Sequence, residues 1–229
     1  MNGFDLTILR FFDRFSGSHP SFDFWVSVLA DSDLFKGYVV MAFVWAIWFM
    51  SDTARTREHI AATLLGCLIA LAVARGLAAM LPFRPRPFST PAFAHSFALG
   101  RAQRGLDTWT AFPSDHATLF AALAAGVWFA SRRAGWLLLV YVIVVVMLPR
   151  LYLGMHYPTD LLAGGAVGVV IAWLVNSHAL RLRIAGPLTR WHTWSPASFY
   201  ACAFLLTSQI AVLFDPVRRL IGVAKVFAS

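Results

Sequence analysis

Residues 149–175 read PRLYLGMHYPTDLLAGGAVGVVIAWLV, in which a short segment of charged and histidine side chains leads directly into an apolar run. Arg150, His156 and Asp160 occupy the first part, and Pro158 suits the first turn of a helix. The apolar run that follows is long enough for a membrane-spanning helix. The stretch therefore predicts a membrane helix that begins beside a cluster of chemically reactive side chains.

The composition of the whole chain is that of a membrane protein. Of its 229 residues, 59% are hydrophobic and only 13% are charged, and the mean hydropathy is +0.67. A soluble domain of this size could not bury so much apolar surface. The net charge of +8 comes mostly from arginines scattered between apolar runs. This pattern fits anionic lipid headgroups or phosphorylated lipids and argues against nucleic acid as a partner.

Six apolar segments predict an all-α, polytopic helical bundle that forms a single domain over residues 1–229. The candidate membrane helices lie at 35–51, 58–82, 115–131, 134–152, 158–178 and 196–214. Gly164 and Gly168, in the fifth segment, form a ridge of small residues that would let a neighbouring helix approach closely.

The two ends of the chain are expected to lie outside this bundle of spans. Residues 1–34 are predicted to be an interfacial segment, in which 4–16 forms an amphipathic helix and 22–31 is interfacial or re-entrant. Residues 215–229 form a basic tail for which we expect loose interfacial contact.

Alternation of six antiparallel helices places three separated motifs on one side of the membrane. Residues 84–87 follow the second segment and residues 113–116 open the third. Arg150, His156 and Asp160 flank the turn between the fourth and fifth segments. We therefore expect the three motifs to form one site.

The basic residues of the short loops predict which way this site faces. The opposite side of the membrane would carry Arg55, Arg57, Arg132, Arg133, Arg181, Arg183 and Arg190. Because short cytoplasmic loops are enriched in arginine and lysine, the site is predicted to face away from the cytoplasm. The arginines near the two chain termini fall on the motif side and oppose this inference.

Two histidines and a carboxylate in these motifs suit cleavage of a phosphate ester without a metal ion or another cofactor. His156 is the candidate nucleophile, and Asp160, four residues later, would fix its tautomer. Ser114 is a natural helix N-cap that would aim backbone N–H groups at an anion, and His116 is the candidate general acid. Taken alone, each motif is better explained as an ordinary helix start. Their combination on one side favours catalysis.

Arginines complete the predicted site. Arg86 and Arg150 are candidate bidentate ligands for phosphate oxygens. Arg75 lies inside an apolar segment, where an ionisable group is costly and usually functional. It precedes Arg86 by eleven residues, close to three helical turns, so it would share that face if the helix continued. The alternative is that Arg75 extends outward as a membrane anchor.

These residues resemble the type-2 phosphatidic acid phosphatase superfamily of membrane phosphatases. Its pattern is Lys-x6-Arg-Pro, then Pro-Ser-Gly-His, then Ser-Arg-x5-His-x3-Asp. The matching residues here are Arg86-Pro87, then Pro113, Ser114 and His116, then Arg150, His156 and Asp160. The resemblance covers about residues 75–165. It implies a helical-bundle fold and metal-independent dephosphorylation, with His156 as nucleophile, Asp160 as its partner and His116 as acid.

Three positions depart from the family pattern. The family lysine falls at Ala79, and either Arg75 or Arg84 is a candidate replacement for its phosphate contact. Asp115 replaces glycine and places a negative charge near the expected anion. Pro149 replaces serine and removes a hydroxyl donor.

The departures are similar to those of the bacitracin-resistance branch, the undecaprenyl pyrophosphate phosphatases. That resemblance implies removal of the terminal phosphate of undecaprenyl pyrophosphate at the outer face of the bacterial inner membrane, which recycles the carrier lipid for peptidoglycan synthesis. The expected partners are the substrate lipid, with a polyprenyl or glycerolipid tail, and membrane lipids. A phosphatidic acid or phosphatidylglycerol phosphate phosphatase, a lipid phosphotransferase and a catalytically silent membrane scaffold or transporter remain alternatives, and the oligomeric state is left open.

Overall fold

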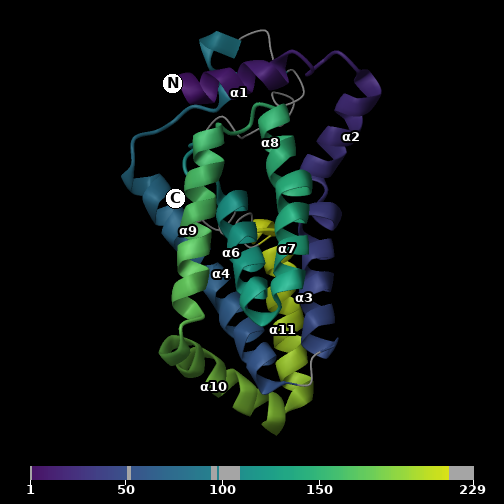
Figure 1. Cartoon of the computed structure of the whole chain (residues 1–229), viewed down its shortest axis with the longest axis vertical. Coiled ribbons are helices and arrows are strands. Elements are labelled where there is room, and N and C mark those ends of the chain that lie inside the picture. The colour runs from purple at the N-terminus through teal and green to yellow at the C-terminus, as the bar shows by residue number, and fades with distance from the viewer. Residues whose placement is uncertain (1, 51–52, 94–96, 98–108, 217–229) are drawn as a thin grey trace, which may run out of the picture.

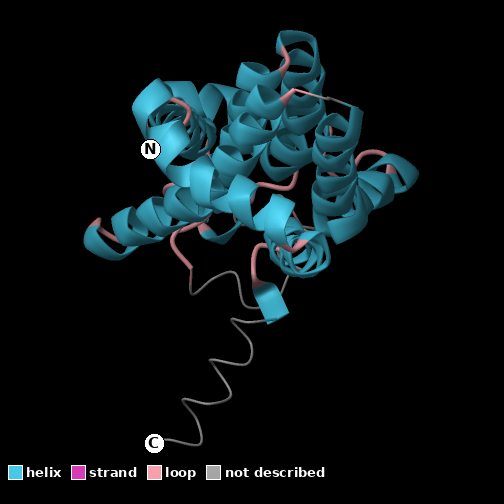
Figure 2. Ribbon diagram, turned by 90° about the horizontal axis from the view of Figure 1, so that it is seen from below, coloured by secondary structure: helices cyan, strands magenta, loops and turns pink. Residues whose placement is uncertain are grey.

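The computed structural model describes residues 2–50, 53–93, 97 and 109–216, and every regular element in these ranges is a helix. The α-helices are α1 (Gly3–Asp13), α2 (Pro20–Asp31), α3 (Val39–Met50), α4 (Ala54–Met80), α6 (Asp115–Ala130), α7 (Arg132–Tyr141), α8 (Leu148–Tyr152), α9 (Pro158–Val175), α10 (His178–Trp194) and α11 (Pro196–Ala211) (Figure 1). The remaining elements are two π-helical turns, η1 (Leu34–Tyr38) and η4 (Val142–Met147), and two 3-10 turns, η2 (Pro87–Ser89) and η3 (Pro91–Phe93). The end-on view in Figure 2 shows the helices gathered into a bundle, which confirms the all-α prediction.

Three helices in the described part of the chain are long and apolar enough to cross a membrane. They are α4, the continuous helix Arg132–Tyr152 formed by α7, η4 and α8, and α9. The helix α2 and the following helix Leu34–Met50 bend by 57° at their junction, and this pair makes a fourth span if it is counted as one. Its first half is the segment 22–31 that the sequence predicts to be interfacial or re-entrant.

Each of the six predicted spans coincides with a helix, but three of these helices are short. The first, Leu34–Met50, is 17 residues long and passes as a span only together with α2. The third predicted span is α6 and the sixth is α11, and both are 16 residues long. Six crossings therefore stay a prediction, whereas a membrane protein with three to four apolar spanning helices is what the described residues show.

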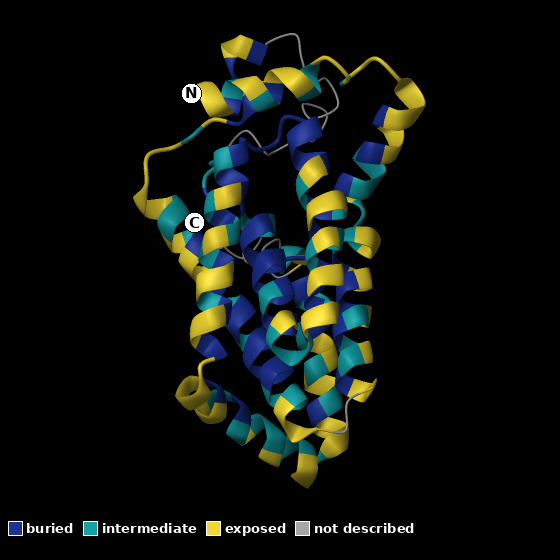
Figure 3. Cartoon of the chain, viewed as in Figure 1, coloured by how far each residue is buried: buried dark blue, intermediate teal, exposed yellow. Residues whose placement is uncertain are grey.

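Large apolar side chains cover the outward faces of the bundle. Trp136 and Leu137 on α7, and Leu162 and Trp173 on α9, are each about three-fifths exposed or more. Figure 3 shows these outward faces in yellow, with α6 largely buried among its neighbours. An apolar exterior of this extent suits a lipid environment.

The close approach of α9 to α6 depends on glycine, as the sequence predicts. A Cβ atom added to Gly168 would lie 2.2 Å from the carbonyl oxygen of Thr118, and one added to Gly164 would lie 2.6 Å from that of Ser114. Both obstructing atoms belong to the backbone of α6 and cannot rotate away. Because the N-termini of α6 and α9 carry His116 and Asp160, this packing sets the distance between two predicted motifs.

The first helix lies across the end of the bundle at which α8 and α9 meet, and α10 crosses the opposite end (Figure 1). The side chain of Asn2 caps α1 by accepting a hydrogen bond of 2.7 Å from the amide of Asp5. Leu9 and Asp5 are buried on its inner side, whereas Phe4 and Phe11 are exposed. The helix predicted at 4–16 is confirmed, and its position at a membrane interface stays a prediction.

The glycine contact yields a matched test of packing. We expect Gly168→Ala to destabilise the protein by about 1–3 kcal/mol, because the methyl group forces α9 away from α6. Gly165→Ala is the control, since its Cβ would lie 4.0 Å from the Cβ of Ala121, an ordinary contact. That control gains helix propensity and is expected to be neutral or stabilising. Denaturant unfolding in detergent measures both, and equal effects would contradict the close-packing account.

Candidate active site

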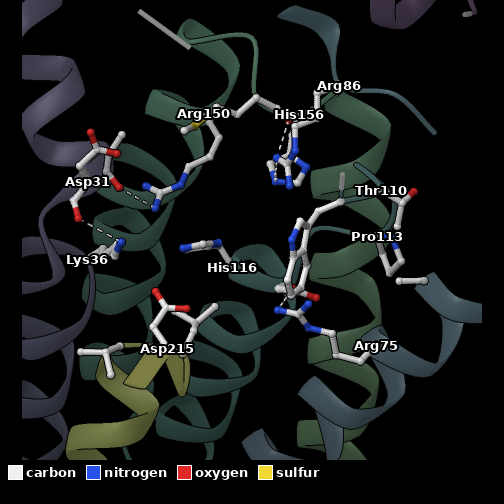
Figure 4. Close-up of a pocket in the computed structure, with 17 residues that line it drawn as sticks. Asp31, Lys36, Arg75, Arg86, Thr110, Pro113, His116, Arg150, His156 and Asp215 are labelled. Carbon is white, nitrogen blue, oxygen red and sulfur yellow. Dashed lines mark hydrogen bonds and ion pairs between the residues drawn. The ribbon is translucent and has the colours of Figure 1, made fainter. Parts of the chain in front are cut away.

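A cavity of about 320 Å³ lies where the N-terminus of α6 meets the C-terminal part of α4, the η1 turn and the residues after α11. Six residues predicted from the sequence line it, namely Arg75, Arg86, Asp115, His116, Arg150 and His156. Figure 4 shows that both imidazoles face this one space. The structure therefore brings together side chains from all three motifs.

The N-terminus of α6 is joined directly to the start of α9. Ser114 is the N-cap of α6, and its Oγ accepts a 3.4 Å hydrogen bond from the amide of Ala117. The amide of Ser114 donates to the carbonyl oxygen of Asp160 over 3.2 Å. The side chain of Ser114 is fully buried and does not line the cavity, so its observed task is to fix the helix start that carries His116.

His156 lies in the turn between α8 and α9, and its contacts determine its tautomer. Its Nε2 lies 3.2 Å from Nη1 of Arg86. A guanidinium can only donate, so Nε2 is the acceptor and carries no proton. The other nitrogen, Nδ1, donates over 2.9 Å to the carbonyl oxygen of Ala111.

This geometry differs in one detail from the sequence-based prediction. The carboxylate of Asp160 lies 3.7 Å from Nδ1 of His156, so the carbonyl of Ala111 is the nearer hydrogen-bond acceptor. Backbone carbonyls have no sequence signature, which is why Ala111 escapes a motif search. Asp160 assists through its charge and through its hold on the turn, since its Oδ2 accepts the amide of Tyr157 over 2.8 Å.

The environment of His156 favours its neutral form. Burial lowers the pKa of this imidazole below its ordinary value of 6.5, and the charge of Arg86 lowers it further, while Asp160 acts in the opposite direction. A neutral imidazole with an unprotonated Nε2 facing a cavity is the form that can act as a nucleophile.

Arg84 lies away from the cavity, behind Asp160. Its guanidinium contacts Oδ1 of Asp160 at 2.5 Å, Oδ2 of Asp5 at 2.7 Å and Oγ1 of Thr159 at 2.9 Å. It also lies over the ring of Tyr157, 4.0 Å from its centroid. Asp5 is completely buried, and it also accepts the amide of Thr159 at 3.0 Å. Asp5, Arg84 and Asp160 therefore form a chain of charges that ties α1 to the turn bearing His156.

Arg86 and Arg150 enter the cavity from positions fixed by backbone carbonyls. Nη1 of Arg86 donates over 2.9 Å to the carbonyl of Met155. The guanidinium of Arg150 donates to the carbonyls of Val146 at 2.9 Å and Ala30 at 3.0 Å. Carbonyl partners orient a guanidinium without neutralising it, so both cations keep their charge for an anion.

Arg75 and Asp115, two positions at which the chain departs from the family pattern, form an ion pair. Nη2 of Arg75 lies 2.5 Å from Oδ2 of Asp115, and the same guanidinium lies 4.6 Å from the ring centroid of Trp109. Ala79, the position of the family lysine, is exposed on α4. Of the two candidate replacements, Arg75 reaches the cavity and Arg84 does not.

Sequence reasoning missed several residues that line the cavity. Lys36 and Asp31 border it on one side and Asp215, just after α11, borders it on another (Figure 4). A lone lysine at the start of an apolar segment was the available signal for Lys36. Asp215 begins the predicted tail, whose residues 217–229 lie outside the described part of the chain.

Asp5 provides a test of the link between α1 and the site. We expect Asp5→Ala to destabilise the protein by roughly 1–3 kcal/mol, because it leaves partly buried donors of Arg84 and Thr159 without the acceptor that they share. Asp13→Ala, at the other end of α1, is the control, since the side chain of Asp13 forms no hydrogen bond or ion pair within the described residues. Thermal unfolding of the detergent-solubilised variants measures the difference, and an Asp5 variant as stable as the Asp13 variant would refute the link.

Comparison with known proteins gives a family match and several relatives of similar sequence. The model of the PAP2 superfamily matches residues 60–183, more than half of the chain. A stretch of 140 residues is 29% identical to undecaprenyl-diphosphatase BcrC of Bacillus subtilis (strain 168), covering 60% of this chain and 67% of that protein.

Two further relatives match over shorter stretches. Phosphatidylglycerophosphatase B of Escherichia coli (strain K12) is 42% identical over 90 residues, which cover 36% of this chain and 34% of the relative. The bacitracin transport permease protein BcrC of Bacillus licheniformis is 39% identical over 64 residues, which cover 28% and 31%. The chain thus spans about a third of these two proteins. No solved structure matches it. The motif resemblance is confirmed by the family match, and the chain belongs to the PAP2 superfamily.

Proposed function

We propose that this protein is a metal-independent phosphatase of the bacterial inner membrane that removes the terminal phosphate of undecaprenyl pyrophosphate. The observation that carries the proposal is Nε2 of His156, held 3.2 Å from Nη1 of Arg86 in a cavity that also contains His116. Membership of the PAP2 superfamily and similarity to an undecaprenyl-diphosphatase support it. The product, undecaprenyl phosphate, would return to cell-wall synthesis as carrier lipid.

The first chemical step would be in-line attack of Nε2 of His156 on the terminal phosphorus, which gives a phosphohistidine. Arg86 and Arg150 are placed to stabilise the charge on the equatorial oxygens, and Arg75 supplies the further cation that the family lysine would provide. Nδ1 of His156 already donates to Ala111, which leaves Nε2 as the nucleophilic nitrogen, and Arg86 would transfer its hydrogen bond from Nε2 to a phosphate oxygen when the substrate binds. As Nε2 bonds to phosphorus, the ring becomes cationic, and the nearby carboxylate of Asp160 stabilises that charge.

His116 would protonate the oxygen that leaves the terminal phosphorus. It lies in the first turn of α6, where the unpaired backbone N–H groups favour a bound anion. In the second step the same imidazole, now neutral, would take a proton from the water that hydrolyses the phosphohistidine. A general acid and base of this kind contributes about 10²–10⁴-fold to the rate.

The site would face the extracytoplasmic side of the membrane. At the opposite end, the first turn of α4 carries Arg55 and Arg57, the first turn of α7 carries Arg132 and Arg133, and α10 adds Arg181, Arg183 and Arg190. Their excess supports a cytoplasmic location for that end.

A glycerolipid phosphate is the second candidate substrate, favoured by the similarity to phosphatidylglycerophosphatase B. The same histidines and arginines would serve either lipid, so the tail decides between them. A lipid phosphotransferase would differ only in the acceptor that replaces water. Transport or a scaffolding role is a different class, suggested by the relative named as a permease. The retained His116, His156 and Asp160 favour catalysis over it.

Phosphate release tests the chemistry. Purified protein is expected to release inorganic phosphate from polyprenyl pyrophosphate in EDTA, and His156→Ala should abolish turnover because it removes the proposed nucleophile. His178→Ala is the matched control, an exposed histidine at the start of α10. A substrate panel with phosphatidate and phosphatidylglycerol phosphate identifies the preferred tail. Strict dependence on added divalent metal, or retained turnover in His156→Ala, would contradict the proposal.

The replacement of the family lysine has its own test. Arg75→Ala should lower kcat/KM by about 10–100-fold if Arg75 makes a charged hydrogen bond to the substrate phosphate. In an Ala79→Lys background the loss should be much smaller, because the lysine would supply the missing charge. Equal losses in the two backgrounds would show that Arg75 does not stand in for that lysine.

A further inference from the structure

Lys36 is a charged residue of the cavity that no catalytic step above uses. It belongs to the η1 turn, and its side chain is 11% exposed. In Figure 4 its ammonium lies on the side of the cavity opposite His156 and Arg86, with His116 between them. Lys36 therefore points into the cavity.

The η1 turn that carries Lys36 is fixed in place by two contacts. A Cβ atom added to Gly37 would lie 1.9 Å from the carbonyl oxygen of Ala211, so the backbone of η1 packs directly on the end of α11. The hydroxyl of Tyr141 donates to the carbonyl of Phe35 over 2.6 Å. A π-helical turn at this position also agrees with the frequent use of such turns at functional sites.

Lys36 and Arg150 lie next to each other at the C-terminal end of α2. Nζ of Lys36 donates to the carbonyl of Asp31 over 3.2 Å, and the guanidinium of Arg150 donates to the carbonyl of the preceding residue, Ala30. Successive carbonyls at a helix C-terminus thus hold two cations next to each other. Nζ of Lys36 also lies 3.0 Å from the carboxylate of Asp33. An ammonium has three donors, so a third N–H remains beyond these two contacts within the described residues.

The position of Lys36 matches the second phosphate of a diphosphate. If the terminal phosphorus lies at His156, the oxygen that leaves it lies at His116, on the far side of that phosphorus. The rest of the leaving group, which is attached to this oxygen, then extends toward the side of the cavity where Lys36 lies. In a diphosphate this group is a second, anionic phosphate, whereas in a monophosphate it is an uncharged lipid chain.

We propose that Lys36 binds the penultimate phosphate, next to Arg150 at the terminal one, and selects diphosphate over monophosphate substrates. The inference rests on the proposed function, because it uses the same nucleophile and leaving-group direction. The bond that breaks joins the terminal phosphorus to the bridging oxygen, and the electron pair stays on that oxygen, which takes a proton from His116. Lys36 stabilises the negative charge on the departing phosphate monoester.

The test compares a polyprenyl diphosphate and a polyprenyl monophosphate with the same tail in detergent micelles. Lys36→Gln is expected to lower kcat/KM for the diphosphate by about 10–100-fold, the effect of losing a charged hydrogen bond, and for the monophosphate by less than about 3-fold. Retained monophosphate turnover shows at the same time that the variant is folded. Lys36→Arg should keep the diphosphate preference, and Arg133→Gln, an exposed cation at the opposite end, should change neither rate. Equal losses on the two substrates, or an unchanged ratio, would overturn the proposal.

A binding measurement separates failure of this inference from failure of the proposed function. Calorimetric titration of the wild type with inorganic pyrophosphate should give tighter binding than with inorganic phosphate, and Lys36→Gln should remove the difference. If wild-type protein hydrolyses neither polyprenyl substrate, the proposed function fails, while the pyrophosphate preference and its loss still support a diphosphate subsite at Lys36. Equal binding of the two anions by the wild type would overturn that subsite whatever the activity.

Discussion

The contact between α6 and α9 determines the geometry of the candidate site. Gly164 and Gly168 let the backbones of the two helices approach so closely that no side chain fits between them at these positions. The amide of Ser114 then donates to the carbonyl of Asp160. His116 lies in the first turn of one helix, and the other helix begins just after His156. A methyl group at either glycine would separate these two starts, so the packing of a membrane helix pair sets the distance across which a phosphoryl group would be transferred.

The electrostatic design of the cavity relies on backbone carbonyls. Arg86 and Arg150 donate to carbonyl oxygens, which orient a guanidinium without neutralising it, and Lys36 donates to a carbonyl oxygen while it also forms an ion pair with Asp33. Outside the cavity, a carboxylate contacts a cation directly, as Asp160 contacts Arg84. Fixed cations in a partly buried site stabilise developing negative charge more strongly than cations in water and need no reorganisation during the reaction. The arrangement therefore suits a substrate that gathers several negative charges in a small volume.

Much of this architecture is predictable from the sequence, and what is not predictable has a physical cause. Apolar segments and the Ser114 and Pro158 helix starts are local signals, and they place α6, α9 and the motif histidines correctly. The pairing of Arg75 with Asp115, the use of Ala111 by His156 and the inward turn of Lys36 depend on contacts between distant segments or on backbone atoms. Arg84 is a second example. Its position in the sequence is compatible with a phosphate contact, but in the structure its guanidinium binds the buried carboxylate of Asp5 on α1. The number of membrane crossings stays a prediction, since α6 and α11 are short.

The central claim is that His156 receives the phosphoryl group. It is tested most directly by rapid quenching of a reaction with substrate labelled in its terminal phosphate, followed by peptide mapping in alkaline conditions that preserve phosphohistidine. The account predicts an acid-labile label on the peptide that contains His156, formed within a single turnover. Turnover without any label on that peptide, or with the label on another residue, would contradict it.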